Sequence, residues 1–195
     1  MCSLLERAAR VSARAWQIVQ DLKIIENWKA VGARPELVGS LRTGLLLGHL
    51  DIDFHIYSDP FLISDSFQAM GRIASHPHIR SVSYSNLLEA DDRCLEWHAI
   101  YAPNGTESWQ IDMIHLHPES RYVGVFEDVA DRIQRALSPE TRCAILAVKD
   151  AVPAGEKAMG IRVYQAVIRD GVRTYAEFRE WEAKNPANGI ITWAP

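Results

Sequence analysis

Two aspartates separated by one residue occur in a segment of alternating polar and apolar side chains. Asp51 and Asp53 lie within residues 49–58, where every second residue is apolar, which is typical of a strand with one buried face. On such a strand their Cα atoms would lie roughly 6.6 Å apart, with both carboxylates on one face. Two acids held in this way repel each other unless a cation lies between them. The pair therefore indicates a site for divalent metal ions, and hard oxygen ligands favour Mg²⁺.

The surroundings of the pair decide how it is interpreted, because an isolated Asp-x-Asp can simply be the solvated face of a strand. Upstream, an apolar strand end runs into Gly39 and Ser40, followed by helical spacing. Such a turn offers backbone N–H groups and a hydroxyl to a phosphate, and glycine lets the phosphate approach closely. Downstream, Asp112 is flanked by apolar residues on a second expected strand, where an unpaired carboxylate is costly. Three acids and a phosphate-binding turn therefore point to one chemistry.

The spacing of these residues resembles that of the DNA polymerase β-like nucleotidyltransferase superfamily, in its small, non-polymerase type. The pattern is Val38-Gly39-Ser40, then Asp51-Ile52-Asp53-Phe54, then Ile111-Asp112-Met113. The resemblance covers about residues 32–117. It implies a mixed-sheet palm with helices on one side and two Mg²⁺ ions. It also implies transfer of a nucleoside monophosphate from an NTP to an acceptor hydroxyl, with release of pyrophosphate.

The resemblance also assigns roles to individual residues. Gly39 and Ser40 would hold the phosphates of the donor, and Asp51 and Asp53 would ligate the metal ions. Asp112 would ligate the metal that activates the acceptor, or would act as the base that takes its proton.

Other charged residues are candidates for contacts with the same ligand. Arg42 occupies a position that is often basic in this family and could bind a phosphate, although it could equally be a surface arginine. In the second half of the chain, three residues could reach back to the triphosphate or the base: Lys149, Lys157 and Tyr164. His49 stands near a position where many members have Ser or Gly, so it is either a neighbour of the site or an exposed strand residue.

The elements that must position these residues are readable in the first half of the chain. Apolar spacing predicts a helix over residues 3–31, in one piece or broken near Asp21. A short strand over 35–40 and a short helix over 41–47 should follow. The remaining expected elements are a strand at 49–58, a helix at 61–75 and strands at 79–88, 94–101 and 108–117. Because Asn104-Gly105 separates the last two strands, they should form a hairpin.

The second half of the chain has only helical patterns, over 126–137, 139–152, 156–170 and 175–184. Ser138 is an expected N-cap before a proline, and Thr174 with Glu177 an expected capping box. We therefore predict an α/β (α+β) fold. Residues 1–120 would form a nucleotidyltransferase palm with an N-terminal helix, and residues 121–195 a helical region packed on it.

Composition limits the classes of partner. The 195 residues carry 21 Lys and Arg against 25 Asp and Glu, a net charge of −4, which does not favour extended nucleic acid as a partner. Three cysteines, Cys2, Cys94 and Cys143, have no disulfide or zinc-finger spacing. We see no signal peptide and no membrane span, so we expect a cytoplasmic protein without a membrane partner.

Two other functional classes remain open at this point. The seven histidines allow a zinc hydrolase, using the polar face of residues 49–55 together with His115 and His117. However, strand periodicity places Asp112 on the opposite face from those two histidines. The chain could also be a catalytically inactive, antitoxin-like binding module with the same fold. Our hypothesis is a metal-dependent nucleotidyltransferase, with ATP as the expected donor and a hydroxyl of a small molecule or protein as acceptor.

Overall fold

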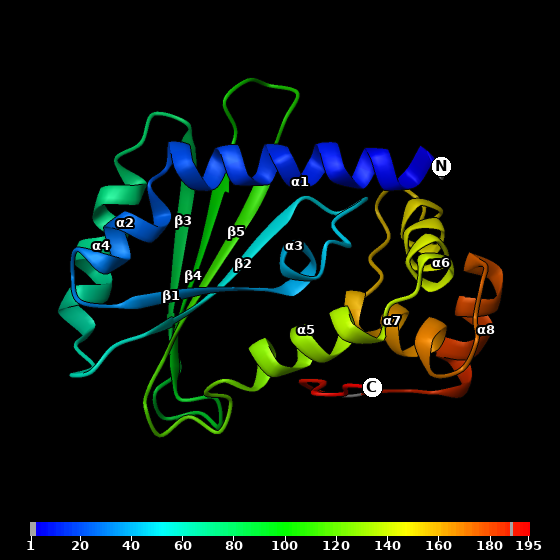
Figure 1. Ribbon diagram of the computed structural model, residues 1–195. Coiled ribbons are helices and arrows are strands. Elements are labelled where there is room, and N and C mark those ends of the chain that lie inside the picture. Colours follow the sequence, from blue (N-terminus) through cyan, green and yellow to red (C-terminus); the bar gives the residue numbers. More distant parts are fainter. Residues whose placement is uncertain (1–2, 188) are drawn as a thin grey trace.

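The computed structural model describes residues 3–187 and 189–195, so Cys2 lies outside the described residues. Five strands form one mixed sheet in the order β1-β2-β5-β4-β3 (Figure 1). The strands are β1 (Arg34–Val38), β2 (Asp51–Tyr57), β3 (Ile79–Asn86), β4 (Cys94–Tyr101) and β5 (Trp109–Leu116). The helices are α1 (Ser3–Asp21), α2 (Ile24–Lys29), α3 (Gly39–Thr43), α4 (Ile63–Ala74), α5 (Val125–Ala136), α6 (Pro139–Asp150), α7 (Gly160–Ile168) and α8 (Tyr175–Lys184). The expected mixed α/β fold is confirmed.

One pair of strands in this sheet is parallel, and it brings together segments that are distant in sequence. β2 pairs with β5 in parallel, whereas β1–β2, β4–β5 and β3–β4 are antiparallel pairs. The β4–β5 hairpin is the one that the Asn-Gly turn predicted. Because β5 is fixed by its hairpin partner, its pairing with β2 determines which residues of the two strands lie side by side.

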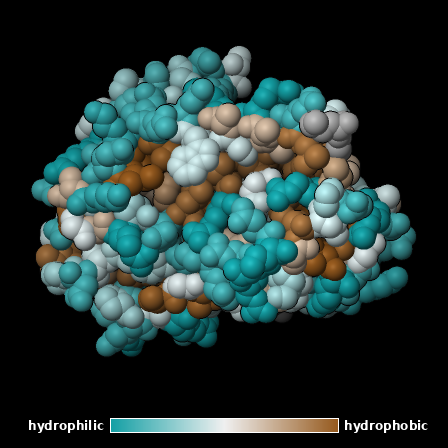
Figure 2. Space-filling model, viewed as in Figure 1, coloured by the Kyte–Doolittle hydropathy of each residue, from teal (hydrophilic) through white to brown (hydrophobic). Residues whose placement is uncertain are grey.

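The larger apolar core lies on one face of the sheet. Alternate residues of β2, among them Ile52, Phe54 and Ile56, pack there with residues of α1, α2 and α4. Figure 1 shows α1 running along this layer, with α2 and α4 at its end. Figure 2 shows that apolar side chains on the viewed face gather in a band along α1, framed by hydrophilic residues. This face of the sheet is therefore committed to the core, which leaves the other face for polar residues.

A second apolar core joins the C-terminal helices α5 to α8. Three residues from the first half of the chain, Ala8, Leu45 and Leu47, are buried in it. Helix α1 therefore contributes to both cores, since its residues Ala15 and Ile18 pack under the sheet. The division into parts at residue 120 stays a prediction, and the two apolar cores do not follow that boundary.

Several element boundaries differ from expectation for local reasons. The break after Asp21 is confirmed, because Lys23 adopts a left-handed conformation (φ 49°) between α1 and α2. The short helix expected over 41–47 lies earlier in the chain: α3 is Gly39–Thr43, and the left-handed Gly44 follows it. The helix expected from residue 156 begins only at Gly160. Among the described residues, none of the helices is long and apolar enough to cross a membrane.

Candidate active site

The parallel β2–β5 pair places the three candidate acids on the same face of two neighbouring strands. In its register Asp53 lies opposite Asp112, and Asp51 lies opposite Gln110. All three acids are half-buried on the face opposite the main core. The arrangement that the sequence pattern required is therefore present, whereas the roles of these acids as metal ligands stay a prediction.

The electrostatics of Asp51 and Asp53 disfavour their charged forms. Burial raises the pKa of Asp51, although the nearby Lys149 and His49 act in the opposite direction. Burial raises the pKa of Asp53 still further, and the charges of Asp51 and Asp112 add to the effect. Two neighbouring carboxylates in such a place are stabilised by a cation between them. Hard carboxylate oxygens are also the ligands that Mg²⁺ takes, so the donor set fits this ion.

Asp112 differs from the other two acids because two side chains bind its carboxylate at short range. His98 Nδ1 lies 2.7 Å from Asp112 Oδ1, and Gln110 Nε2 donates to both carboxylate oxygens at 3.0 Å. Burial lowers the pKa of His98, but the hydrogen bond and charge of Asp112 outweigh it, so the pKa is raised. His98 and Gln110 therefore hold Asp112 in place, and the sequence interpretation missed both.

Gly39 is required by the approach of Asp53 to the start of α3. It has a left-handed φ of +67°, and a Cβ atom there would lie 2.1 Å from Asp53 Oδ2. The next residue, Ser40, donates its hydroxyl to Asp51 Oδ1 at 3.4 Å. The sequence interpretation explained this glycine by room for a phosphate. The structure adds a second reason, which is that only glycine leaves room for the Asp53 carboxylate.

Asp51, Asp53 and the start of α3 line a cavity of about 460 Å³ between the sheet and the C-terminal helices, whereas Asp112 is not among its lining residues. Its polar end contains Gly39, Ser40, His49, Asp51, Asp53 and Lys149. The other end is mostly apolar and includes Ile114, Leu116, Tyr122 and Phe126. Pockets of this kind, apolar with a few convergent polar groups, are typical of small-molecule sites.

Lys149 is a buried cation in the wall that α6 contributes to this cavity. It is 9% exposed, and its Nζ donates to the carbonyl of Leu45 at 2.7 Å. Burial lowers its pKa to about 8, while the charges of Asp51 and Asp53 raise it. Tyr164 of α7 lines the same wall, with its ring 5.9 Å from Nζ. Lysine and tyrosine are thus placed beside the acids, as a contact with a phosphate requires.

The remaining candidates are placed differently. Arg42 is half-buried and donates to Asp131 Oδ1 and to the carbonyl of Leu37, each at 2.9 Å. It therefore joins α3 to α5 and β1, and this geometry does not support the phosphate contact expected for it. Lys157 lines a smaller cavity, which adjoins the main one and shares His49, Lys149 and Ala158 with it. His49 is a neighbour of Asp51 in the main cavity.

The histidines of the zinc alternative do not gather at one place. His55 lines the main cavity on the Asp51 face of the sheet. His115 is fully buried on the other face, edge-on to Trp28, with Nε2 2.8 Å from the hydroxyl of Ser58. Burial lowers the pKa of His115 to about 4, which is typical of a neutral core histidine. The periodicity argument against a zinc centre from these residues therefore holds.

Comparison with known proteins gives matches at the level of fold. No protein-family model matches the chain, and no curated protein matches it. The polymerase core of TRAMP, an RNA surveillance complex, has a similar structure, with a TM-score of 0.53 and 17% identity. That match covers 80% of this chain and 48% of the other. The Cid1 poly(U) polymerase has a TM-score of 0.51 at 13% identity, over 84% of this chain and 53% of the other. The chain thus spans about half the length of these structures, and the fold expected from the sequence is confirmed.

Proposed function

We propose that this chain, which has the polymerase β-like nucleotidyltransferase fold, transfers a nucleoside monophosphate from an NTP to a hydroxyl. ATP is the expected donor, and the acceptor hydroxyl belongs to a small molecule or a protein. The observation that carries the proposal is the β2–β5 register, which places Asp53 beside Asp112. The same Asp53 carboxylate lies against Gly39 at the polar end of the cavity.

The donor would be held at the polar end of this cavity. Asp51 and Asp53 would hold two Mg²⁺ ions, which supply charge neutralisation on the transferred phosphoryl group and on the leaving pyrophosphate. Ser40 lies at the start of α3, where its backbone and hydroxyl can contact the phosphates. Lys149 adds a cation from the opposite wall, and binding a phosphate would replace its hydrogen bond to Leu45. The acids and the start of α3 are already oriented, so the contribution of the protein is mainly positioning and electrostatics.

Asp112 would act on the acceptor. His98 and Gln110 hold its carboxylate in one orientation, and such support keeps a catalytic group within the small tolerance that proton transfer needs. In this position Asp112 would receive the proton of the acceptor hydroxyl as its oxygen attacks the α-phosphorus, or would ligate the metal ion at that oxygen. Removing any of the three acids should therefore cost orders of magnitude in rate.

The acceptor end of the cavity favours a small, partly apolar molecule or side chain. Tyr122 and Phe126 line that end, and Glu96 lies there with its carboxylate 3.7 Å from His98 Nε2. An extended single strand would need a basic groove with stacking aromatic residues, whereas the chain has a net charge of −4. The lining of the cavity and the net charge of the chain thus support a small molecule or a protein side chain, rather than a nucleic acid, as the acceptor.

Thermal unfolding with each NTP and Mg²⁺ tests this proposal, together with pyrophosphate release in the presence of candidate acceptors. The wild type should be stabilised only when nucleotide and Mg²⁺ are both present. Asp53→Asn should lose this stabilisation. Because burial raises the pKa of Asp53, the substitution should also make the ligand-free protein more stable at neutral pH. A misfolded variant would instead lose stability both with and without ligand.

The half-buried Asp65 in the first turn of α4 provides a matched control. Asp65→Asn changes the same functional groups and the same net charge, and it should behave as wild type in both measurements. If the wild type shows no stabilisation by any combination of Mg²⁺ and NTP, the transferase proposal is wrong. The inactive binding module would then be the better interpretation.

A further inference from the structure

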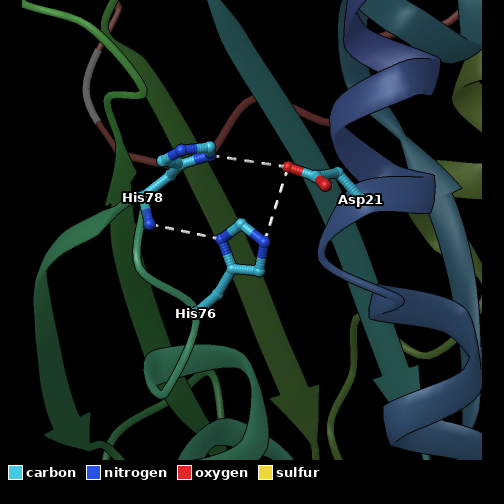
Figure 3. A group of neighbouring side chains, drawn as sticks. All are labelled: Asp21, His76 and His78. Carbon is cyan, nitrogen blue, oxygen red and sulfur yellow. Dashed lines mark hydrogen bonds and ion pairs between the residues drawn. The ribbon is translucent and has the colours of Figure 1, made fainter.

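A group of potential metal ligands lies at the end of α1, on the side of the sheet opposite the three acids. Asp21 is the last residue of α1, and His76 and His78 flank Pro77 in the segment between α4 and β3. Figure 3 shows the two imidazole rings and the carboxylate pointing toward one another. One nitrogen of each ring and one carboxylate oxygen lie within 4.8 Å of one another.

The distances between the imidazole nitrogens and the carboxylate oxygen are too long for good hydrogen bonds. His76 Nε2 lies 3.5 Å and His78 Nδ1 lies 3.7 Å from Asp21 Oδ2. In a tetrahedral zinc site with bonds of about 2.0–2.1 Å, neighbouring ligand atoms are about 3.3–3.4 Å apart. A circle through three atoms with the observed separations has a radius of at most about 2.4 Å. Shifts of a few tenths of an ångström would therefore place all three atoms at bonding distance from one ion.

One buried polar atom of the group has no partner that would explain the group as a hydrogen-bonded cluster. His78 Nδ1 is buried and has no hydrogen-bond partner among the described residues. Asp21 lies in the last turn of α1, which contains no basic residue, and the helix dipole disfavours a carboxylate at that end. A cation bound at this place would satisfy both groups. The side chains of Asp21 and His78 are 44% and 39% exposed, so water can complete the coordination shell.

The neighbouring residues orient the ligands. The Tyr101 hydroxyl donates to Asp21 Oδ2 at 2.9 Å. The backbone N–H of His78 donates to His76 Nδ1 at 3.3 Å, so a neutral His76 carries its proton on Nε2. When Nε2 binds a metal ion, that N–H bond breaks and an N–H bond forms at Nδ1, with no net release of protons. The cost is the loss of one long hydrogen bond and the approach of two N–H donors, which a metal–imidazole bond outweighs.

We propose that Asp21, His76 and His78 bind one Zn²⁺ ion, with water as a fourth ligand. Two imidazoles and a carboxylate are ligands that suit zinc. The ion would connect the end of α1 to the segment that leads into β3, two parts of the chain that lie far apart in sequence. The site is distinct from the Mg²⁺ site proposed above, and it does not depend on the proposed function.

The test measures zinc content and affinity in the full-length protein, with excess Mg²⁺ present to occupy the other acids. The wild type should bind one equivalent of Zn²⁺ with high affinity and unfold at a higher temperature when zinc is added. Asp21→Asn and His78→Ala should each weaken binding by at least about 100-fold, because even the loss of an outer partner costs about 10–100-fold. Circular dichroism and the wild-type response to Mg²⁺ and NTP would show that the variants are folded.

His117 offers a matched control. Like His76, its Nδ1 accepts a hydrogen bond from the backbone N–H two residues later, from Glu119 at 3.2 Å. His117→Ala should therefore bind zinc as the wild type does. The proposal is wrong if the wild type takes up no zinc under these conditions. It is equally wrong if Asp21→Asn and His78→Ala bind as tightly as the wild type, since the ion would then be held elsewhere.

Discussion

Replacement of Gly39 by alanine tests the close contact between the start of α3 and Asp53. The new Cβ would lie 2.1 Å from Asp53 Oδ2, whereas real Cβ contacts are essentially never shorter than 3.0 Å. Either the carboxylate or the backbone must therefore move by about 1 Å, and a misplacement of that size can cost about 100-fold in rate. Alanine in the left-handed region adds about 1–2 kcal/mol of backbone strain. We expect Gly39→Ala to lower the free energy of unfolding by more than this backbone strain alone. We also expect the variant to lose its stabilisation by Mg²⁺ and NTP.

Gly32 separates the two contributions. Its φ of +79° is similarly left-handed, but a Cβ there has no heavy atom within 4 Å among the described residues. Gly32→Ala should thus show the backbone strain alone in urea unfolding, with normal nucleotide binding. In the background of Asp53→Ala, the cost of Gly39→Ala should fall to that of Gly32→Ala, because the clashing carboxylate is gone. If Gly39→Ala and Gly32→Ala have the same urea midpoint and both still bind Mg²⁺ and NTP, the argument for this contact is refuted.

Three further results follow from other sites. Because burial lowers the pKa of Lys149 to about 8, affinity for Mg²⁺-ATP should fall as pH rises through about 8, and calorimetry should show a flat profile for Lys149→Met. His115 has a pKa of about 4 when folded against 6.5 when unfolded. Protonation of His115 in the unfolded state therefore lowers the free energy of unfolding by up to about 3 kcal/mol as pH falls from 6.5 toward 4, and has no effect above pH 6.5. Urea unfolding of His115→Gln should lack that part of the pH dependence. Ser138→Ala removes the acceptor for the backbone N–H of Thr141 and should lower the free energy of unfolding by about 1 kcal/mol; an unchanged urea midpoint would contradict this.

The parts of the fold that local signals determine were predictable from the sequence. The capping boxes at Ser138 and Thr174 are both present, and α6 and α8 begin directly after them. The Asn-Gly turn separates the two strands of the β4–β5 hairpin. In each case the information lies within a few residues, so one segment of sequence is enough to specify the structure.

Boundaries that depend on tertiary packing were not predictable. Residues 45–47 look like the continuation of a helix, but the left-handed Gly44 ends α3. Leu45 and Leu47 then pack against the C-terminal helices, whereas Leu46 packs under the sheet. A short apolar run does not show which of two cores its residues will enter.

Some features of the candidate site were likewise predictable from the sequence, whereas others depend on tertiary packing. The positions of Asp51, Asp53 and Asp112 follow from spacing on strands, and the structure places them on one face. The support of Asp112 by His98 depends on the register across the loop between β4 and β5, which the sequence does not specify. The partner of Arg42 is likewise Asp131, on a helix remote in sequence.

Helix α1 limits how the two halves of the cavity can move. Its early residue Ala8 is buried among the C-terminal helices, its later residue Ile18 is buried under the sheet, and Arg7 forms an ion pair with Asp150 of α6 at 2.8 Å. A hinge motion that separated the helical wall from the sheet would have to bend this helix or pull one end out of its core. Lys149 and the acids it faces are therefore set at a fixed spacing before a ligand arrives. Little of a ligand's binding energy would then be spent on closing the protein around it.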